Sequence, residues 1–255
     1  MPGVPGVPEV PEVPKVLRVP RVPRVHGARR WLAAGGAGLA LAASLLLVAR
    51  VAPERVPAWL GGSDVDPRFA ALVEAVGEQR YVEPRLTGGF RYGPLRSATR
   101  SGSGVQTANL ALLAAAGELQ KAADADPTPE NLHAWGVAQL LLERYDDAVH
   151  TLRAVVGADP TAPRYRADLA AALAARAAHT GNPEDWQAAL DAARLARGLE
   201  PSMAEALFTE ALALEAIDRG FESQAAWQRY LRWDQDSEWA AEAQRRLGLR
   251  SDPPK

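Results

Sequence analysis

The side chains that most often carry out chemistry in proteins are few and scattered in this sequence. No two of the four histidines are three or four positions apart, the spacing that two metal ligands on one helix would need. The chain has no cysteine, which excludes a thiol nucleophile, a thiolate-held cluster and a disulfide scaffold. No glycine-rich loop leads into Lys-Ser or Lys-Thr, the pattern that binds phosphates. We therefore expect no catalytic residues, no metal, no cofactor and no enzyme activity.

The apolar residues after residue 105 have helical spacing, and their pattern recurs. In residues 131–160 the large residue Leu132 is followed by the small residues Gly136 and Ala148, and the segment ends at Pro160. Small residues are needed where two antiparallel helices touch, because a larger side chain would push the helices apart. This segment resembles a tetratricopeptide repeat, a helix–turn–helix unit of about 34 residues.

A second unit ends at Pro201, which follows Pro160 by 41 residues. We place the seven extra residues in the turn at 179–186. A third unit is less regular, because Glu210 and Ser223 stand where Leu and Ala are usual.

An amphipathic segment at 238–247 is expected to cap the stack, since stacked repeats need a polar outer surface to stay soluble. The resemblance covers 105–247. It predicts an all-α fold, a tetratricopeptide-like helical solenoid of about three units plus a capping helix.

In this repeat family the first helices of successive units line a concave groove that holds peptides or partner helices. Carried over by the resemblance, the groove residues are His133, Val137, Leu140, Arg164, Ala167, Ala171, Ala174, Phe208, Leu212 and Glu215. A clamp for a terminal carboxylate needs several basic residues, and the groove offers only Arg164, so we expect an apolar peptide or helix of a protein partner. The alternative is that these side chains pack within the solenoid and bind nothing.

The stretch from residue 80 to residue 104 is expected to be an irregular loop. Within it five arginines alternate with Tyr81, Phe90 and Tyr92. Such alternation can bind single-stranded nucleic acid, but the body of the protein is acidic and we expect no nucleic-acid partner. We expect the aromatic rings to pack the loop onto the first helices and the arginines to be solvated, or the loop to contact a partner.

The net charge of −2 hides two unlike regions. Residues 1–30 hold six basic and two acidic residues, whereas residues 51–255 hold 22 basic and 29 acidic ones. The basic tail has Val at every third position and many prolines, which excludes a packed core. We interpret it as a low-complexity extension; the alternative is a stiff spacer or a groove ligand.

Residues 31–49 contain no charge and are flanked by arginines on both sides. A helix of 19 residues comes close to spanning the ~30 Å hydrocarbon core of a bilayer. We predict an uncleaved single transmembrane helix; the alternative is a cleaved signal peptide. The heavier positive charge before the helix places the N-terminus in the cytoplasm and the repeats outside it, in a bacterial envelope. Small residues at Gly36/Ala40 and Gly38/Ala42 would allow a weak homodimer.

The expected organisation therefore has five parts. They are a disordered Pro/Val-rich basic tail at 1–30, a transmembrane helix at 31–49, a linker with a short helix and an irregular loop at 50–104, the solenoid with its capping helix at 105–250, and a tail at 251–255.

Three phrases also resemble bacterial membrane-anchored proteins in which tetratricopeptide repeats precede a caspase-like CHAT peptidase domain. They are VEPRLTGGFRYGPLR (82–96), AEALFTEALALEA (204–216) and AWQRYLRWDQDSEWAAEA (226–243). The resemblance implies a protease domain with a Cys/His pair as the usual partner, but this chain has no cysteine and no catalytic half, so no activity carries over. We expect a membrane-anchored scaffold or adaptor for a protein or peptide. The alternative is a regulatory or sensor subunit of a separate CHAT-type peptidase, or a truncated member of that family.

Overall fold

The structure is a computed structural model that describes residues 66–95 and 103–249, with the side chains of residues 103–109 left out of the description. The predicted tail, the transmembrane helix at 31–49 and its small-residue pairs lie outside the described residues. Within the described ranges, no helix has both the length and the apolar character needed to cross a membrane.

The described ranges form nine helices and no strand, apart from one isolated bridge between Arg80 and Leu95. This confirms the predicted all-α fold for the part of the chain that the structure describes. The helices are α2 Pro67–Val76, α3 Ser103–Ala125, α4 Pro129–Leu141, α5 Tyr145–Ala158, α6 Pro163–Thr180, α7 Pro183–Leu199, α8 Ala204–Ala216, α9 Gly220–Leu231 and α10 Glu238–Arg246.

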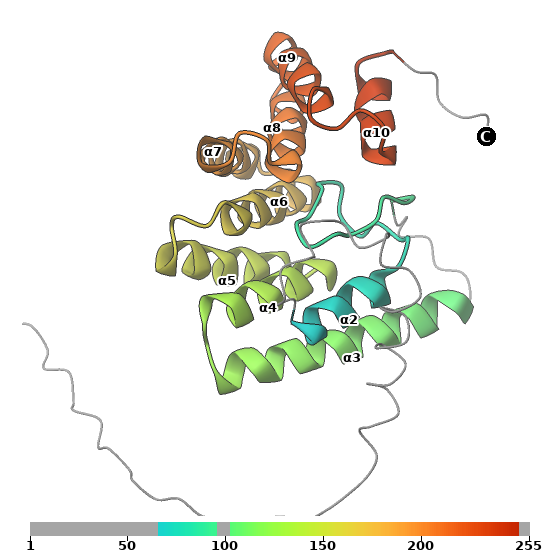
Figure 1. The fold of residues 1–255 in the computed structure, drawn as a ribbon, viewed down its shortest axis with the longest axis vertical. Helices are drawn as coiled ribbons and strands as arrows, with labels where there is room; N and C mark the ends of the chain where they lie inside the picture. Colours follow the sequence, from blue (N-terminus) through green and yellow to red (C-terminus); the bar gives the residue numbers. More distant parts are fainter. Residues whose placement is uncertain (1–65, 96–102, 250–255) are drawn as a thin grey trace, which may run out of the picture. The chain divides into compact units, whose positions relative to one another are not determined.

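The helices from α4 onward pack as successive pairs, α4 with α5, α6 with α7 and α8 with α9, and each pair packs on the next (Figure 1). The first helices of the pairs also contact one another, because α6 touches both α4 and α8. The helices α2 and α3 form a further pair before them, and α10 packs on α9. The paired stack is the arrangement expected of a helical-repeat solenoid.

The second pair is longer than the first, and the reason differs from the prediction. Helices α6 and α7 have 18 and 17 residues, against 13 and 14 in α4 and α5. The connection between α6 and α7 is short: Gly181 ends α6 in the left-handed conformation and Asn182 caps the N-terminus of α7. The placement of the extra residues in the turn at 179–186 is therefore wrong, because they lengthen both helices.

The two helices of the first pair touch where the sequence predicted. A Cβ atom added to Gly136 would lie 2.8 Å from Cγ of Leu152 in the facing helix. Ala148 on α5 is fully buried. Larger side chains at these positions would force the helices apart, which confirms the predicted need for small residues.

The irregular third pair is held by a buried charge. The carboxylate of Glu210 is 3% exposed and forms ion pairs with the side chains of Arg194, Arg197 and Arg229. The Oγ of Ser223 donates to the backbone oxygen of Ala211 across the pair, at 3.5 Å. Polar residues are tolerated at these two positions because both find partners inside the protein.

Candidate functional site

After α2, residues 77–95 fold back over the face formed by the first helices of the pairs and reach α10 (Figure 1). We call Arg80–Leu95 the cis segment. Its two ends lie together, since the Arg80 amide donates to the backbone oxygen of Pro94 at 3.2 Å. Gly93 is required at this closure, because a Cβ there would lie 1.6 Å from the backbone oxygen of Glu78.

One end of the contact is a fully buried carboxylate on α6, which we call the inner anchor. Oδ1 of Asp168 accepts the backbone N–H of Thr87 at 2.9 Å, and Oδ2 accepts the Thr87 hydroxyl. The same Oδ2 lies 2.7 Å from Nε2 of His133 on α4. One carboxylate therefore joins the cis segment to two neighbouring first helices, with every contact shielded from water.

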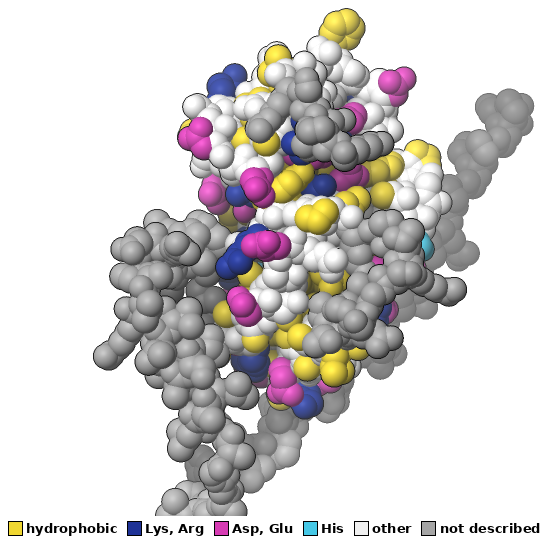
Figure 2. All heavy atoms as spheres, turned by 90° about the vertical axis from the view of Figure 1, so that its right-hand side faces the viewer, with side chains coloured by type: hydrophobic (Ala, Val, Ile, Leu, Met, Phe, Trp, Pro, Cys, Tyr) yellow, Lys and Arg dark blue, Asp and Glu magenta, His cyan; other side chains and the backbone are white. Residues whose placement is uncertain are grey.

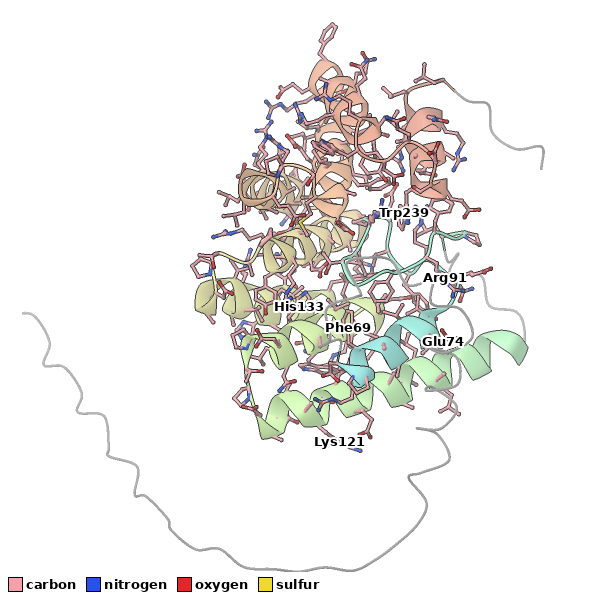
Figure 3. All side chains as sticks on the ribbon, in the orientation of Figure 1. Phe69, Glu74, Arg91, Lys121, His133 and Trp239 are labelled. Atoms are coloured by element: carbon pink, nitrogen blue, oxygen red, sulfur yellow. The ribbon has the colours of Figure 1, made fainter. Side chains whose placement is uncertain are left out.

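Aromatic rings flank this anchor. The His133 ring lies 6.3 Å from the ring of Phe69 on α2 and 4.8 Å from that of Tyr165 on α6. Figure 3 shows Phe69 and His133 as neighbours on adjacent elements. Phe90 of the cis segment packs edge-on against Phe69 at 6.0 Å. The rings fix the position of His133 and exclude water from the Asp168 carboxylate.

At the other end, which we call the outer anchor, Arg85 meets the third pair. Its Nη1 donates to the Tyr230 hydroxyl at 2.8 Å and to Oδ2 of Asp234 at 2.7 Å. Its Nε lies 3.8 Å from the carboxylate of Glu205 on α8. The guanidinium also lies over the ring of Trp239, 5.7 Å from the ring centre.

The surroundings of Arg85 shift the pKa values of its three partners, Tyr230, Glu205 and Asp234. Burial raises the pKa of Tyr230, so its phenol stays protonated and donates to Asp234. Burial also raises the pKa of Glu205, and the charge of Arg85 only partly opposes that shift. The pKa of Asp234 moves down instead, because hydrogen bonds from Ser237 and Tyr230 and the charge of Arg85 outweigh its burial. The lowered pKa keeps Asp234 charged at neutral pH, beside the Arg85 guanidinium.

Helix α10 closes the same end. The Tyr92 hydroxyl donates to Oε2 of Glu242 at 2.8 Å and accepts from Arg245 at 2.8 Å. Arg246 pairs with Glu83 of the cis segment and with Glu242. Burial alone would raise the pKa of Glu242, but the hydrogen bonds from Arg245 and Tyr92 and the charge of Arg246 lower it to about 2. The predicted capping helix therefore exists, and it also holds the cis segment.

Eight of the ten predicted groove residues are buried in this arrangement. Val137, Leu140, Ala167, Ala171, Ala174 and Phe208 are fully buried, Leu212 is 3% exposed and His133 is 8% exposed. The structure brings His133 to the inner anchor and Phe208 to Trp239, with ring centres 5.2 Å apart. Ala167 instead packs with Ala196, Met203 and Ala206, in a separate cluster among α6, α7 and α8.

The two charged groove residues keep exposed side chains. Arg164 lies in the first turn of α6 and donates to the Tyr165 hydroxyl at 2.9 Å. Glu215 accepts from Trp227 and from Arg246 at 3.1 Å each. Partner binding by the ten residues stays a prediction.

The expectation for the loop is confirmed for its aromatic residues and wrong for two of its arginines. Tyr81 and Phe90 are buried in the core, and Tyr92 packs against Trp239 with ring centres 5.1 Å apart. The guanidinium of Arg80 lies 4.9 Å from the Tyr92 ring centre, and Arg85 is paired as described. Burying the rings draws these arginines in, because a planar guanidinium can stack on aromatic faces. Arg91 remains exposed.

The acceptors of the two anchors were missed by reasoning from the sequence. A signal for Asp168 exists: it is the single carboxylate in the alanine-rich helix α6, and it shares a face with Arg164 and Ala171. No comparable signal identifies Tyr230 or Asp234. Their partner Arg85 lies 145 and 149 positions away in the chain.

The acidic and basic side chains around the site do not form separate patches. On the face drawn in Figure 2, acidic and basic side chains are interspersed with hydrophobic ones. Among the residues that the structure describes, no group of three or more His, Asp or Glu is arranged to hold a metal ion.

No protein-family model matches this chain, and no curated protein matches it. Solved structures that are similar to it include the tetratricopeptide-repeat (TPR) protein TTC0263 of Thermus thermophilus, with 21% identity and a TM-score of 0.49 over 57% of this chain and 80% of that one. The Arabidopsis OM64 TPR domain has 19% identity and a TM-score of 0.42 over 47% of this chain and 93% of that one. The first TPR of Spaghetti (RPAP3) bound to an HSP90 peptide has 20% identity and a TM-score of 0.41 over 47% of this chain and 92% of that one. At such values the likeness concerns the repeat architecture alone.

Proposed function

We propose that this chain is a membrane-anchored scaffold whose helical solenoid binds an extended segment of a protein partner. The observation that carries the proposal is the cis segment itself: the face of the first helices holds a stretch of polypeptide without helix or strand, bound through side-chain acceptors. A surface with side-chain acceptors for a backbone N–H, a hydroxyl and a guanidinium has the chemistry for peptide recognition. The anchoring part of the proposal rests on the charge-free residues 31–49.

Capture from membranes tests the binding. The full chain, tagged at its C-terminus and purified in detergent, is compared with an Asp168→Asn plus Asp234→Asn variant. The matched control is Asp191→Asn plus Glu184→Gln, which changes two exposed carboxylates on α7. The wild type and the control should retain the same protein, and the anchor variant should lose it.

Two results would count against the scaffold. Capture of nothing by the wild type, at concentrations that suit micromolar binding, contradicts it. Equal capture by the anchor variant, with an unchanged melting temperature, would move binding away from this face. The membrane part has its own test: carbonate washing should leave the chain in the membrane pellet, and protease added outside spheroplasts should digest 51–255.

A specific observation supports a second candidate, a regulatory subunit of a separate CHAT-type peptidase. The three phrases that resemble such proteins meet at one place, because 82–96 contains the cis segment's anchoring residues, 204–216 is α8, and 226–243 covers the second half of α9 and most of α10. The resemblance is thus concentrated in this intramolecular contact. A neighbouring gene for a Cys/His peptidase, whose product co-purifies with the tagged chain, would favour this candidate over a general adaptor.

A further inference from the structure

We propose that the cis segment is a built-in ligand of this face, and that the partner carries an Arg-x-Thr sequence that replaces Arg85 and Thr87 at their anchors. The inference rests on the proposed function and adds the chemistry of the partner. Until the partner arrives, the chain's own Arg85-Leu86-Thr87 closes the site.

The acceptors on the solenoid specify this chemistry. With the cis segment removed, Asp168 would keep its contact with His133, and Asp234 would keep its bonds from Tyr230 and Ser237. Both carboxylates and that of Glu205 would lose the donors that Thr87 and Arg85 supply. Carboxylates with unfilled acceptor positions beside an apolar surface favour a cation and hydrogen-bond donors and repel acidic peptides. Arginine suits the outer anchor better than lysine, because its planar guanidinium donates to Tyr230 and Asp234 while lying over Trp239.

The spacing of the two anchored residues can be reproduced by another chain. Arg85 and Thr87 are two positions apart, and the chain between the bends at 81–84 and 87–88 brings each of them to its own anchor. The intervening Leu86 is buried at 4% exposure, so an apolar residue belongs between them. The Thr87 N–H bond to Asp168 fixes the register of the backbone as well as the identity of the side chain.

The cis segment fits less well at its beginning than at its anchors. Arg80 is 9% exposed, and its Nε and Nη1 have no hydrogen-bond partner among the described residues. Arg80 also borders a cavity of about 20 Å³, which Leu141 and Trp239 help to line. Buried donors without acceptors destabilise the bound form of the segment. A partner with the anchoring residues and no counterpart of Arg80 would avoid that penalty.

Thiol labelling tests whether the segment opens separately from the fold. The chain has no cysteine, so a single buried thiol can be placed at Leu86→Cys, with Leu152→Cys on α5 as the matched control, since Leu152 is fully buried. In the full chain in detergent, Leu86→Cys should react at least about tenfold faster than Leu152→Cys, because local opening precedes global unfolding. Equal rates, both following global unfolding, would make the segment an inseparable part of the core and overturn the proposal.

A peptide in trans tests the recognition. A fluorescent peptide of residues 80–95 should bind the full-length Arg85→Ala plus Thr87→Ala chain at least about tenfold more tightly than the wild type, whose own segment competes. The same peptide with both anchoring residues replaced by Ala should bind neither. No binding by a double variant that keeps its helical circular dichroism would overturn the proposal.

The labelling experiment keeps both anchors intact, so it tests the built-in ligand even if the double variant fails to fold. Failure of the built-in ligand can be distinguished from failure of the proposed scaffold. A captured partner together with equal labelling rates leaves the scaffold standing on another surface. A separately opening segment that no captured protein displaces removes the scaffold and leaves the built-in ligand.

Discussion

The two anchors of the cis segment hold it in different ways. At the inner anchor one fully buried carboxylate, Asp168, binds a backbone N–H, a hydroxyl and an imidazole. At the outer anchor Arg85 contacts Glu205 on α8, the phenol of Tyr230 on α9 and Asp234 just after α9, and its side chain remains 22% exposed. Hydrogen bonds that are shielded from water contribute more free energy and depend strongly on geometry. Ion pairs that are partly solvated respond to salt and pH. The inner anchor should therefore set stability and register, and the outer anchor should set the response to conditions.

Removing the inner carboxylate should have the largest effect. Asp168→Ala leaves the Thr87 N–H, its hydroxyl and His133 without their shared acceptor, and we expect a loss of about 3–5 kcal/mol in the free energy of unfolding. Asp168→Asn should lose less, because the amide oxygen still accepts one of these bonds. Urea denaturation measures both.

Asp191→Ala, on the exposed side of α7, is the control and should change the free energy by no more than about 0.5 kcal/mol. If Asp168→Ala proved as mild as this control, the inner anchor would not hold the cis segment, and the difference between the two ends would disappear.

The contrast between the anchors also explains what the sequence could predict. The helix pairs follow from short-range patterns, such as Gly136 facing α5 and Ala148 facing α4, because periodicity acts over one or two turns. The inner anchor joins Thr87 to Asp168 across 81 positions, and no local pattern encodes such a pairing. The loop's aromatic residues indicate packing onto the helices, but the pairing of its arginines is hidden from the sequence because their acceptors come from distant parts of the chain. The groove residues lie on the helices that the sequence indicates, while nothing local indicates that the cis segment shares the inner anchor with one of them, His133.

Removing the arginine should have the second largest effect. Arg85→Ala breaks charge-assisted bonds to Tyr230 and Asp234, for which we expect a loss of about 1.5–3 kcal/mol. The loss is limited because Asp234 keeps its bonds from Tyr230 and Ser237. The difference from the wild type should shrink as salt is raised, since the group is partly exposed.

Arg91→Ala is the matched control, because the Arg91 side chain is 66% exposed and only loosely paired with Glu78 at 3.9 Å. It should leave the denaturation midpoint nearly unchanged. A salt-independent loss for Arg85→Ala would mean that the outer anchor behaves like the inner one.

Acid should loosen the outer anchor, and near neutral pH this effect is the smallest of the three. The pKa of Glu242 is about 2 in the folded protein, below the usual value near 4.5. As the pH falls, the folded state therefore takes up this proton at a lower pH than the unfolded state does. This contribution to stability is complete above the unfolded pKa and is lost as the pH falls from about 5 towards 2. Asp234, whose pKa also moves down, should act in the same direction. Melting temperatures measured across this range should fall less steeply for Glu242→Gln than for the wild type. Parallel slopes would show that Glu242 does not carry the acid sensitivity, and that the bonds from Tyr92 and Arg245 hold α10 to the cis segment without its charge.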